Sequence, residues 1–158
     1  MRNLEEIINA DELRFEGMDA SLFLLGLLSA FENRYQAKAD SFFEEISWKQ
    51  FFAIICINLC KESPTIKELA EIMGSSHQNV KQILIKLENK GFVEIIADEQ
   101  DKRKQRIVLT EKTMIFCEEH EEGSQRIIKK IFEGIDIENI EIVIKTLLQM
   151  EKNLKEAD

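Results

Sequence analysis

Proline is scarce in this sequence, and so are glycine and histidine. The 158 residues include one proline, six glycines and two histidines, while 44% are hydrophobic and 32% are charged. This balance is typical of a soluble, helix-rich globular protein rather than a disordered one. The length is sufficient for one well-buried core and too short for two ordinary domains in series. We therefore expect the chain, 1–158, to form one elaborated unit.

The motifs of common catalytic sites are missing as well. The sequence has no metalloprotease helix motif, no glycine-rich phosphate loop and no Gly-x-Ser-x-Gly turn. Cys117, His120 and Glu121 lie close together, but two or three ligands on one helix do not close a tetrahedral shell around a metal. We expect no catalysis, no cofactor and no metal site, and structural or solvent-facing roles for these three side chains.

Three cysteines do not suggest the disulfide framework of a small secreted domain. Cys56 and Cys60 are four residues apart in an apolar run, so they share a helix face. We expect them to pack in the core, and a reducing cytoplasm fits this cysteine usage. The alternative is a thiol-based redox-sensing regulator, in which oxidation repacks this helix.

No secretion signal or membrane span is expected. The segment 1–16 carries acidic residues where a signal peptide needs a basic and then an apolar stretch. The richest apolar runs, 22–28 and 51–60, are interrupted by Gly26 and Asn58 and are too short to cross a bilayer. They are predicted to be buried helix faces.

Negative charge exceeds positive charge by nine over the whole chain, which alone argues against nucleic-acid binding. The excess is unevenly distributed. Residues 65–110 contain eight Lys or Arg and seven Asp or Glu, so this segment carries +1 and the remainder −10. The acidic surplus therefore does not exclude a nucleic-acid site within residues 65–110.

Two helices joined by a tight turn are predicted between Thr65 and Gly91. Thr65 and Glu68 form a capping box, and the short helix that they begin closes at Gly74. Ser75 or Ser76 then caps a longer helix, which continues with apolar residues at helical spacing until Gly91. This arrangement is a helix-turn-helix.

A β-hairpin is predicted to follow. The apolar spacing changes to that of strands over 92–96 and 106–109, with a seven-residue tip of mixed charge over 98–104. We interpret the hairpin as a wing. The predicted fold is mainly α with a small β-hairpin wing, a winged helix-turn-helix spanning 47–110.

The flanking regions, 1–46 and 111–158, are predicted to be helical. Apolar spacing from 18 to about 38 predicts a long, mostly buried helix. Ser47 and Gln50 form a capping box for the next helix, which ends before Pro64. The C-terminal region shows a break in the helix near Gly134 and a new N-cap at Asp136. Its apolar stripe is longer than a single small domain can bury. We expect both regions to form dimerisation helices.

The segment from Ser47 to Thr110 resembles the MarR family of winged-helix regulators. The resemblance rests on the joint order of Glu68-Leu69-Ala70, Leu87-Glu88-Asn89-Lys90-Gly91-Phe92-Val93, Asp98-Glu99-Gln100-Asp101-Lys102-Arg103 and Val108-Leu109-Thr110. It implies a homodimeric regulator, a repressor, that binds a pseudopalindromic double-stranded DNA operator. Two positions depart from the family pattern: Gln100 replaces a basic residue of the wing tip, and Thr113 replaces a glycine.

Predicted DNA contacts come from two elements. The second helix of such a motif lies in the major groove, where amides suit adenine edges, and the wing lies on phosphates or the minor groove. The expected contacts are Ser76, His77, Gln78, Asn79, Lys81, Gln82 and Lys86 in the helix and Lys102, Arg103, Lys104 and Arg106 in the wing. Arg103 has a second predicted role, an ion pair with Asp98 or Asp101 that stiffens the hairpin.

The resemblance also implies a small aromatic effector. Aromatic side chains cluster near the junction of the dimerisation helices and the helix-turn-helix. Aromatic residues at helical spacing are also common in the hydrophobic core, which is the alternative role. The predicted pocket residues are Trp48, Phe51, Phe52, Phe23 and Phe31. A winged-helix protein–protein interaction module without DNA binding is the alternative that the acidic total charge supports.

Overall fold

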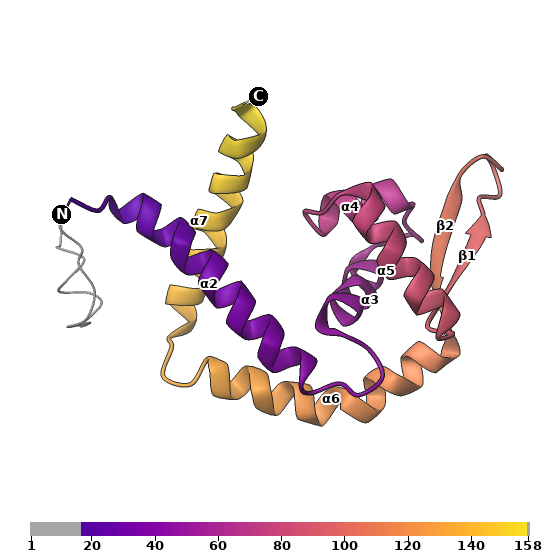
Figure 1. The fold of residues 1–158 in the computed structure, drawn as a ribbon, viewed down its shortest axis with the longest axis horizontal. Helices are drawn as coiled ribbons and strands as arrows, with labels where there is room; N and C mark the ends of the chain where they lie inside the picture. Colours follow the sequence, from indigo (N-terminus) through magenta and orange to yellow (C-terminus); the bar gives the residue numbers. More distant parts are fainter. Residues whose placement is uncertain (1–16, 158) are drawn as a thin grey trace. The chain divides into compact units, whose positions relative to one another are not determined.

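The computed structural model describes residues 17–157, which form two compact units, one up to Thr113 and one from Met114. Six helices and one two-stranded sheet are described (Figure 1). Their bounds are α2 Ala20–Asp40, α3 Trp48–Leu59, α4 Ile66–Ile72, α5 His77–Asn89, β1 Val93–Ala97, β2 Gln105–Leu109, α6 Glu111–Ile131 and α7 Ile137–Glu156. None of the described helices is both long enough and apolar enough to span a membrane.

Side-chain caps set where the helices of the first unit begin, as the sequence predicted. The Ser47 hydroxyl accepts the Gln50 N–H at 3.3 Å, and the Gln50 amide oxygen accepts the Ser47 N–H at 3.0 Å. Thr65 and Glu68 make the same reciprocal pair at 3.3 and 2.7 Å. These bonds satisfy N–H groups that a helix start otherwise leaves without a partner.

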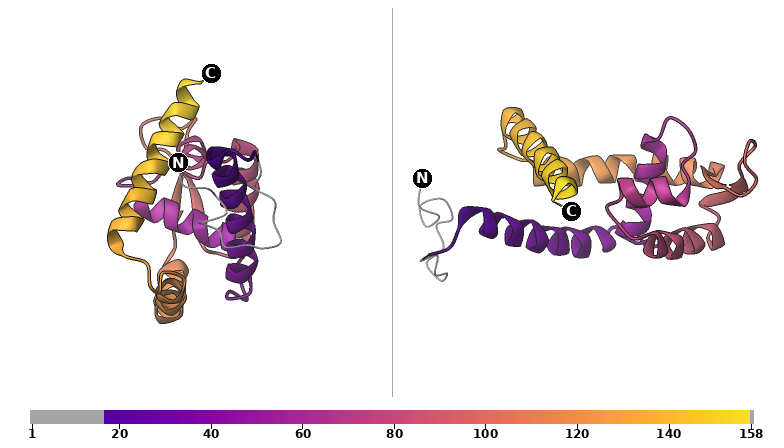
Figure 2. Two further views of the ribbon diagram at one scale, coloured as in Figure 1. Left: turned by 90° about the vertical axis from the view of Figure 1, so that its left-hand side faces the viewer. Right: turned by 90° about the horizontal axis from the view of Figure 1, so that it is seen from above.

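One apolar core joins α3, α4, α5 and the hairpin. Fully buried side chains come from every one of these elements: Ala53, Leu69, Val80, Leu84, Leu87, Phe92 and Ile107. Figures 1 and 2 show the hairpin following directly on α5. Gly91 makes the connection with φ +76°, a left-handed conformation that side chains rarely adopt.

The two strands are antiparallel, with Val93 opposite Leu109 and Ala97 opposite Gln105. The tip between Ala97 and Gln105 is therefore the predicted seven-residue segment. The Ile107 N–H donates to the Pro64 carbonyl at 2.9 Å, which ties β2 to the start of the helix-turn-helix. The wing and the two-helix motif are therefore one structural piece.

Thr113, the residue that replaces a family glycine, has a structural role. Its side chain is fully buried, and its hydroxyl donates to the Phe92 carbonyl. The Thr110 hydroxyl donates to the Gly91 carbonyl at 2.7 Å. The two threonines attach the start of α6 to the start of the wing.

The prediction that the first long helix is mostly buried is wrong. Figure 2 shows α2 as one continuous helix, and only Ala39 near its end is buried. Leu22 is 63% exposed, Leu25 52% and Phe31 54%. The apolar stripe exists, but the described residues of this chain leave it uncovered.

The second unit contains most of α6 and all of α7. The predicted break lies at Gly134, which has φ +76°, and α7 begins after Asp136. Asp136 stands at the N-cap position but makes no capping hydrogen bond with its side chain. Helix α7 has no buried residue at all, and its exposed apolar side chains include Ile137, Val143, Ile144, Leu148 and Leu154.

Candidate nucleic-acid interface

Helix α5 has one buried face and one exposed face. Val80, Ile83, Leu84 and Leu87 are buried against the core. At 100° per residue, the opposite side of the helix consists of Gln78, Gln82, Ile85 and Asn89, all of which are exposed. This face, which we call the ridge, presents three side-chain amides and Ile85 to solvent.

Asn79 lies on a flank of α5 rather than on the ridge. Its amide nitrogen donates to the Ser75 hydroxyl at 2.8 Å, and its backbone N–H donates to the Ser76 hydroxyl at 3.2 Å. Ser76 is therefore the N-cap, and Ser75 holds the Asn79 side chain. Both serines stabilise the start of α5.

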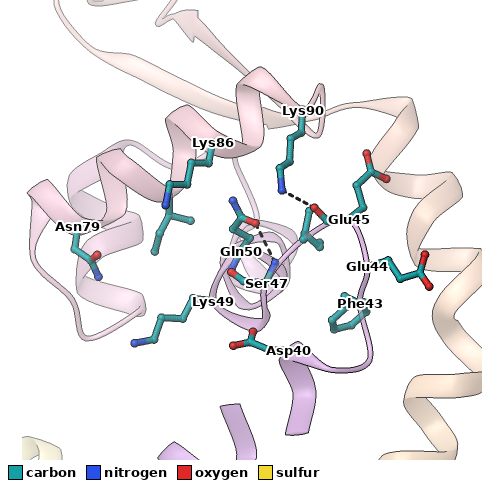
Figure 3. A pocket seen from close by; sticks show the side chains of 12 residues that line it. Asp40, Phe43, Glu44, Glu45, Ser47, Lys49, Gln50, Asn79, Lys86 and Lys90 are labelled. Atoms are coloured by element: carbon teal, nitrogen blue, oxygen red, sulfur yellow. Dashed lines mark hydrogen bonds between the residues drawn. The ribbon is translucent and has the colours of Figure 1, made fainter. Parts of the chain in front are cut away.

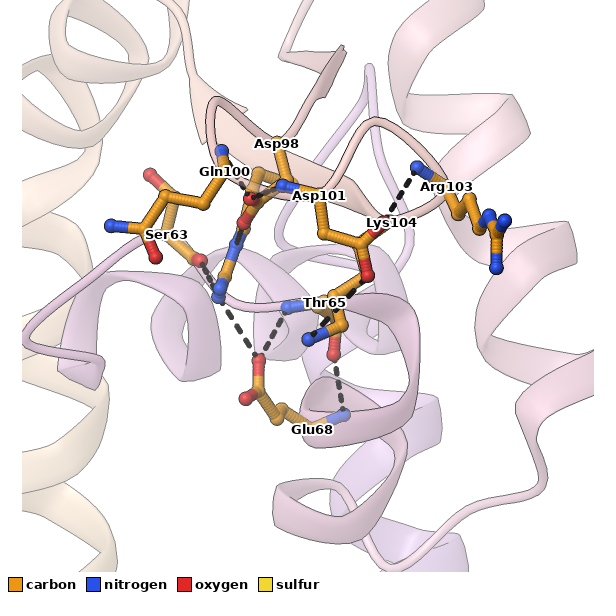
Figure 4. A network of polar contacts seen from close by, with 9 residues as sticks. Ser63, Thr65, Glu68, Asp98, Gln100, Asp101, Arg103 and Lys104 are labelled. Atoms are coloured by element: carbon orange, nitrogen blue, oxygen red, sulfur yellow. Dashed lines mark hydrogen bonds and ion pairs between the residues drawn. The ribbon is translucent and has the colours of Figure 1, made fainter.

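Arg106 holds the wing against α4. Figure 4 labels three residues that Arg106 contacts, Ser63, Glu68 and Asp98. The Arg106 Nε donates to Asp98 Oδ2 at 2.6 Å, and its Nη1 donates to the Ser63 carbonyl at 2.9 Å and lies 3.4 Å from Glu68 Oε2. Asp98 also accepts the N–H groups of Gln100 and Asp101 at 2.9 and 2.8 Å. This network joins the strand, the wing tip and the first turn of α4.

The same contacts shift the ionisation of Asp98. The hydrogen bond from Arg106 and the two backbone N–H donors lower the pKa of Asp98 to about 2. The Asp98 carboxylate in turn raises the pKa of Arg106. The pair is therefore fully ionised near neutral pH.

The expected ion pair of Arg103 is not formed. Arg106 makes the contact with Asp98, and Arg103 contributes only its backbone N–H, which donates to Asp101 Oδ1 at 3.1 Å. The strand register explains the difference. Arg106 lies opposite Ile96, two residues before Asp98, so Arg106 and Asp98 share a face of the hairpin. The guanidinium of Arg103 is left exposed at the tip.

A cationic groove of about 330 Å³ lies between α4, α5 and the wing. It brings together four of the predicted DNA contacts, His77 and Lys81 from α5 and Arg103 and Lys104 from the wing. Lys67, on α4, also lines it, although the sequence analysis did not select it. Lys67 follows the capping residue Thr65 by two positions, and only the placement of the wing reveals its role. Lys102 is exposed at the tip.

Lys86 lies on the other flank of α5 and lines a cavity of about 500 Å³ between α5 and the connection of α2 to α3 (Figure 3). The lining is electrostatically mixed, with Lys49, Lys86 and Lys90 beside Asp40, Glu44 and Glu45. The Lys90 ammonium donates to the Glu45 carbonyl, and Lys112 pairs with the Glu45 carboxylate. The α2–α3 connection is thereby tied to the end of α5 and the start of α6.

An aromatic cavity of about 450 Å³ opens near the start of α3. Three of the predicted pocket residues line it, Phe31, Trp48 and Phe52, together with Tyr35, whose ring meets Trp48 edge-on at 4.7 Å. Phe23 and Phe51 are not among its lining residues. Phe51 packs against Phe43 at 4.6 Å instead. Tyr35 was missed, although it follows Phe31 by four residues and so shares its helix face.

Met73, Gly74, Ser75 and Asn79 also line the aromatic cavity. These residues form the turn of the helix-turn-helix and the first turn of α5. The cavity therefore connects the aromatic cluster of α2 and α3 with the residues that hold the start of α5.

All three thiols are at least partly buried. Cys56 is buried as predicted, and the Cys60 thiol is half-buried and donates to the Cys56 carbonyl at 3.2 Å. Burial raises the pKa of Cys56, Cys60 and Cys117 above the ordinary thiol value. A raised pKa lowers the thiolate fraction, which is the reactive form.

His120 is engaged within its own helix. Its ring stacks on Phe116 with centroids 4.1 Å apart, and its Nδ1 lies 2.8 Å from the Phe116 carbonyl oxygen. These contacts use the imidazole in packing within α6.

Comparison with known proteins finds one family model and many solved structures that match this arrangement. The family model named MarR family matches residues 46–104. Among solved structures, a MarR/EmrR family transcriptional regulator from Acinetobacter sp. ADP1 superposes with a TM-score of 0.77 at 16% identity, over 88% of this chain and 99% of that one. FabT of Streptococcus pneumoniae, solved in complex with DNA, gives 0.62 at 24% identity, over 89% and 100%.

A third match is BpsR of Bordetella bronchiseptica, whose structure addresses regulation of its DNA binding by 6-hydroxynicotinic acid. Its TM-score is 0.70 at 16% identity, over 88% of this chain and 96% of that one. At these identities the likenesses to solved structures establish the fold, and the segment matched by the family model contains α3, α4, α5, β1 and the wing tip. Residues 46–104 match the MarR family model, and solved structures of MarR-type regulators share the fold of this chain.

Proposed function

We propose that this protein is a sequence-specific double-stranded DNA-binding transcriptional regulator, a repressor that places α5 in the major groove. The observation that carries the proposal is the exposed amide ridge of α5 beside the cationic groove and the wing. An α-helix fits the major groove, where each base pair presents a distinct set of donors and acceptors. The FabT structure in complex with DNA supports the same use of this fold.

Within the ridge, Gln78 and Gln82 are the base-reading side chains. Each carries a donor and an acceptor that match the N6 and N7 edge of adenine. Asn79 is a positioning residue, because its amide is bonded to Ser75. Lys86 and Lys102 are proposed to contact phosphates, which add affinity but no sequence information. Arg106 is also a positioning residue, because its guanidinium is hydrogen-bonded to Asp98 and to the Ser63 carbonyl.

The protein functions as a homodimer in this proposal. The exposed apolar side chains of α2 and α7 need a covering surface, and a second copy of the chain supplies one. Two α5 helices then meet a pseudopalindromic site with half-sites about 34 Å apart. Light scattering at micromolar concentration should give the mass of a dimer. A strictly monomeric mass would contradict this part of the proposal.

A small aromatic effector that binds in the aromatic cavity would release the DNA. Such a ligand would contact Phe31, Trp48 and Phe52 on one side and the turn before α5 on the other. BpsR, whose DNA binding is regulated by 6-hydroxynicotinic acid, is a precedent in this fold. The coupling expected for such a switch is about 1–3 kcal/mol, and DNA must weaken effector binding by the same factor.

The effector and the thiol hypotheses are separated by one titration. Phenolic compounds and peroxide are added to the DNA complex of the wild type and of a Cys56→Ser, Cys60→Ser, Cys117→Ser variant. We expect release by a phenolic compound and none by peroxide, because burial raises the pKa of all three thiols. Peroxide release that disappears in the variant would establish the redox switch instead.

A regulator of this kind acts through binding alone. We assign it no catalytic step and no cofactor, and we place it in the cytoplasm with its DNA. Selection of bound sequences from random duplex DNA tests the function. Enrichment of one pseudopalindromic sequence is expected, whereas a protein that selects nothing would be a protein-interaction module.

A further inference from the structure

We infer that the cationic groove between α4, α5 and the wing holds one backbone phosphate of the bound duplex, with Lys67, Lys81 and Arg103 as its ligands. This inference rests on the proposed function and adds a residue, Lys67, that neither the α5 ridge nor the wing tip contains. Each ligand comes from a different element: Lys67 from α4, Lys81 from α5 and Arg103 from the wing.

The charge of the groove matches an anion. Its lining residues are Thr65, Ile66, Lys67, His77, Lys81, Arg103, Lys104 and Gln105, without one carboxylate. Among the described residues 17–157, the side chains of Lys67, Lys81 and Arg103 form no ion pair, and all three are exposed. Three cations converge here without an internal counter-ion.

The nearest acidic side chains already have partners. Glu68 accepts the Thr65 N–H at 2.7 Å and pairs with Arg106. Asp101 accepts the Arg103 N–H at 3.1 Å, and its other oxygen lies 4.0 Å from Lys104. These two carboxylates are bonded to residues at the edge of the groove. The side chains of Lys67, Lys81 and Arg103 therefore remain able to bind an anion.

The geometry of duplex DNA places a phosphate at this point. A major groove and the adjacent minor groove are separated by one sugar–phosphate strand, so a protein with α5 in the first and the wing on the second must straddle that strand. The groove is the space between those two elements. The Arg106 network fixes the wing to α4, so the groove does not have to form when DNA arrives (Figure 4).

The test neutralises one phosphate at a time. Duplexes of the selected sequence are made with a single methylphosphonate at each position, and affinities are measured for the wild type, Lys67→Gln, Lys81→Gln and Arg103→Gln. Lys38→Gln is the matched control, because Lys38 is an exposed lysine of α2 outside the groove. All four substituted side chains are exposed, and thermal melting verifies that each variant folds.

We expect one phosphate in each half-site whose neutralisation weakens wild-type binding roughly tenfold, the scale of one charge-assisted contact. The same methylphosphonate should reduce the affinity of the three groove variants much less. It should reduce the affinity of Lys38→Gln as much as that of the wild type. Because the three ligands share one phosphate, replacing all three together should lower the salt slope by about 0.9 on any duplex, and each single substitution should lower it by less.

Three results would overturn the inference. If each methylphosphonate weakens binding by Lys67→Gln as much as it weakens binding by the wild type, Lys67 is not a ligand of the phosphate. If Lys67→Gln and Arg103→Gln show a reduced affinity loss at different phosphates, the groove is not one site. If the wild type binds no duplex at all, the proposed function fails together with the inference, and that result is recognised before any variant is measured.

Discussion

The head formed by α3, α4, α5 and the wing differs from helices α2 and α7 in how each covers its apolar residues. In the head, Val80, Leu84 and Ile107 are fully buried, and its buried side-chain polar atoms all have partners within the described part of the chain. Helix α7 has an equally clear apolar stripe but no buried residue. The head buries its own apolar residues, whereas α2 and α7 leave theirs exposed.

The largest expected effect concerns the uncovered helix. Replacing Ile144 and Leu148 together by Asp should raise the dimer dissociation constant more than a hundredfold, because burying two such side chains contributes about 3 kcal/mol or more. Sedimentation velocity measures the shift. Lys145→Gln, on the same helix, is the control, since Lys145 pairs with Glu141 at the surface. A dimer that persists in the double variant would place the interface elsewhere.

Within the head, neighbouring residues of α5 should behave very differently. Leu84 is fully buried and Ile85 is 37% exposed. Leu84→Ala should lower the free energy of unfolding by about 2–5 kcal/mol, as expected for a cavity in a packed core. Ile85→Ala should cost less than about 1 kcal/mol. Urea denaturation at a fixed protein concentration compares the two variants. Equal losses of unfolding free energy would mean that α5 does not bury Leu84 and expose Ile85 as described.

The start of α5 provides a comparison between base reading and positioning. Gln78→Ala should cost about 1–3 kcal/mol on the selected sequence and little on random DNA. Asn79→Ala should cost about 0.5–1.5 kcal/mol on both, because it removes the hydrogen bond to Ser75 rather than a base contact. Fluorescence anisotropy with both duplexes measures the four affinities. A sequence-specific loss for Asn79→Ala would show that Asn79 also contacts a base.

The smallest expected effect is the acid sensitivity of the wing. The pKa of Asp98 is lowered from its ordinary 3.8 to about 2 in the fold. The ionised carboxylate therefore stabilises the fold above about pH 4, and this contribution is lost as the pH falls through about 2. Asp98→Asn should reduce the dependence of unfolding on pH in this window. Glu99→Gln, at the same tip, is the control and should leave that dependence unchanged.

Local chemistry explains which parts of this structure were predictable from the sequence. The capping pairs of Ser47 with Gln50 and Thr65 with Glu68 are encoded within four residues, and both are confirmed. The wing was recognisable from a change in apolar spacing. Burial of the long N-terminal helix was predicted wrongly, because apolar spacing marks one face of a helix but does not show which other residues pack on it.

The candidate site was predictable only in outline. Choosing Arg106 over Arg103 as the partner of Asp98 requires the strand register, which places Arg106 opposite Ile96. The turn geometry that holds Asn79 against Ser75 is equally invisible in a list of polar residues. Lys67 joins the site only once the wing is placed beside α4.

The central claim, that α5 reads the sequence of duplex DNA, is tested most directly by one ratio of affinities. The wild type is titrated against the selected duplex and a random duplex of the same length over a range of salt concentrations. The account predicts binding to the selected duplex that is at least about a thousandfold tighter, with affinity for both duplexes falling linearly on a log–log plot as salt rises. Equal affinity for the two duplexes, or affinity that does not respond to salt, would contradict it.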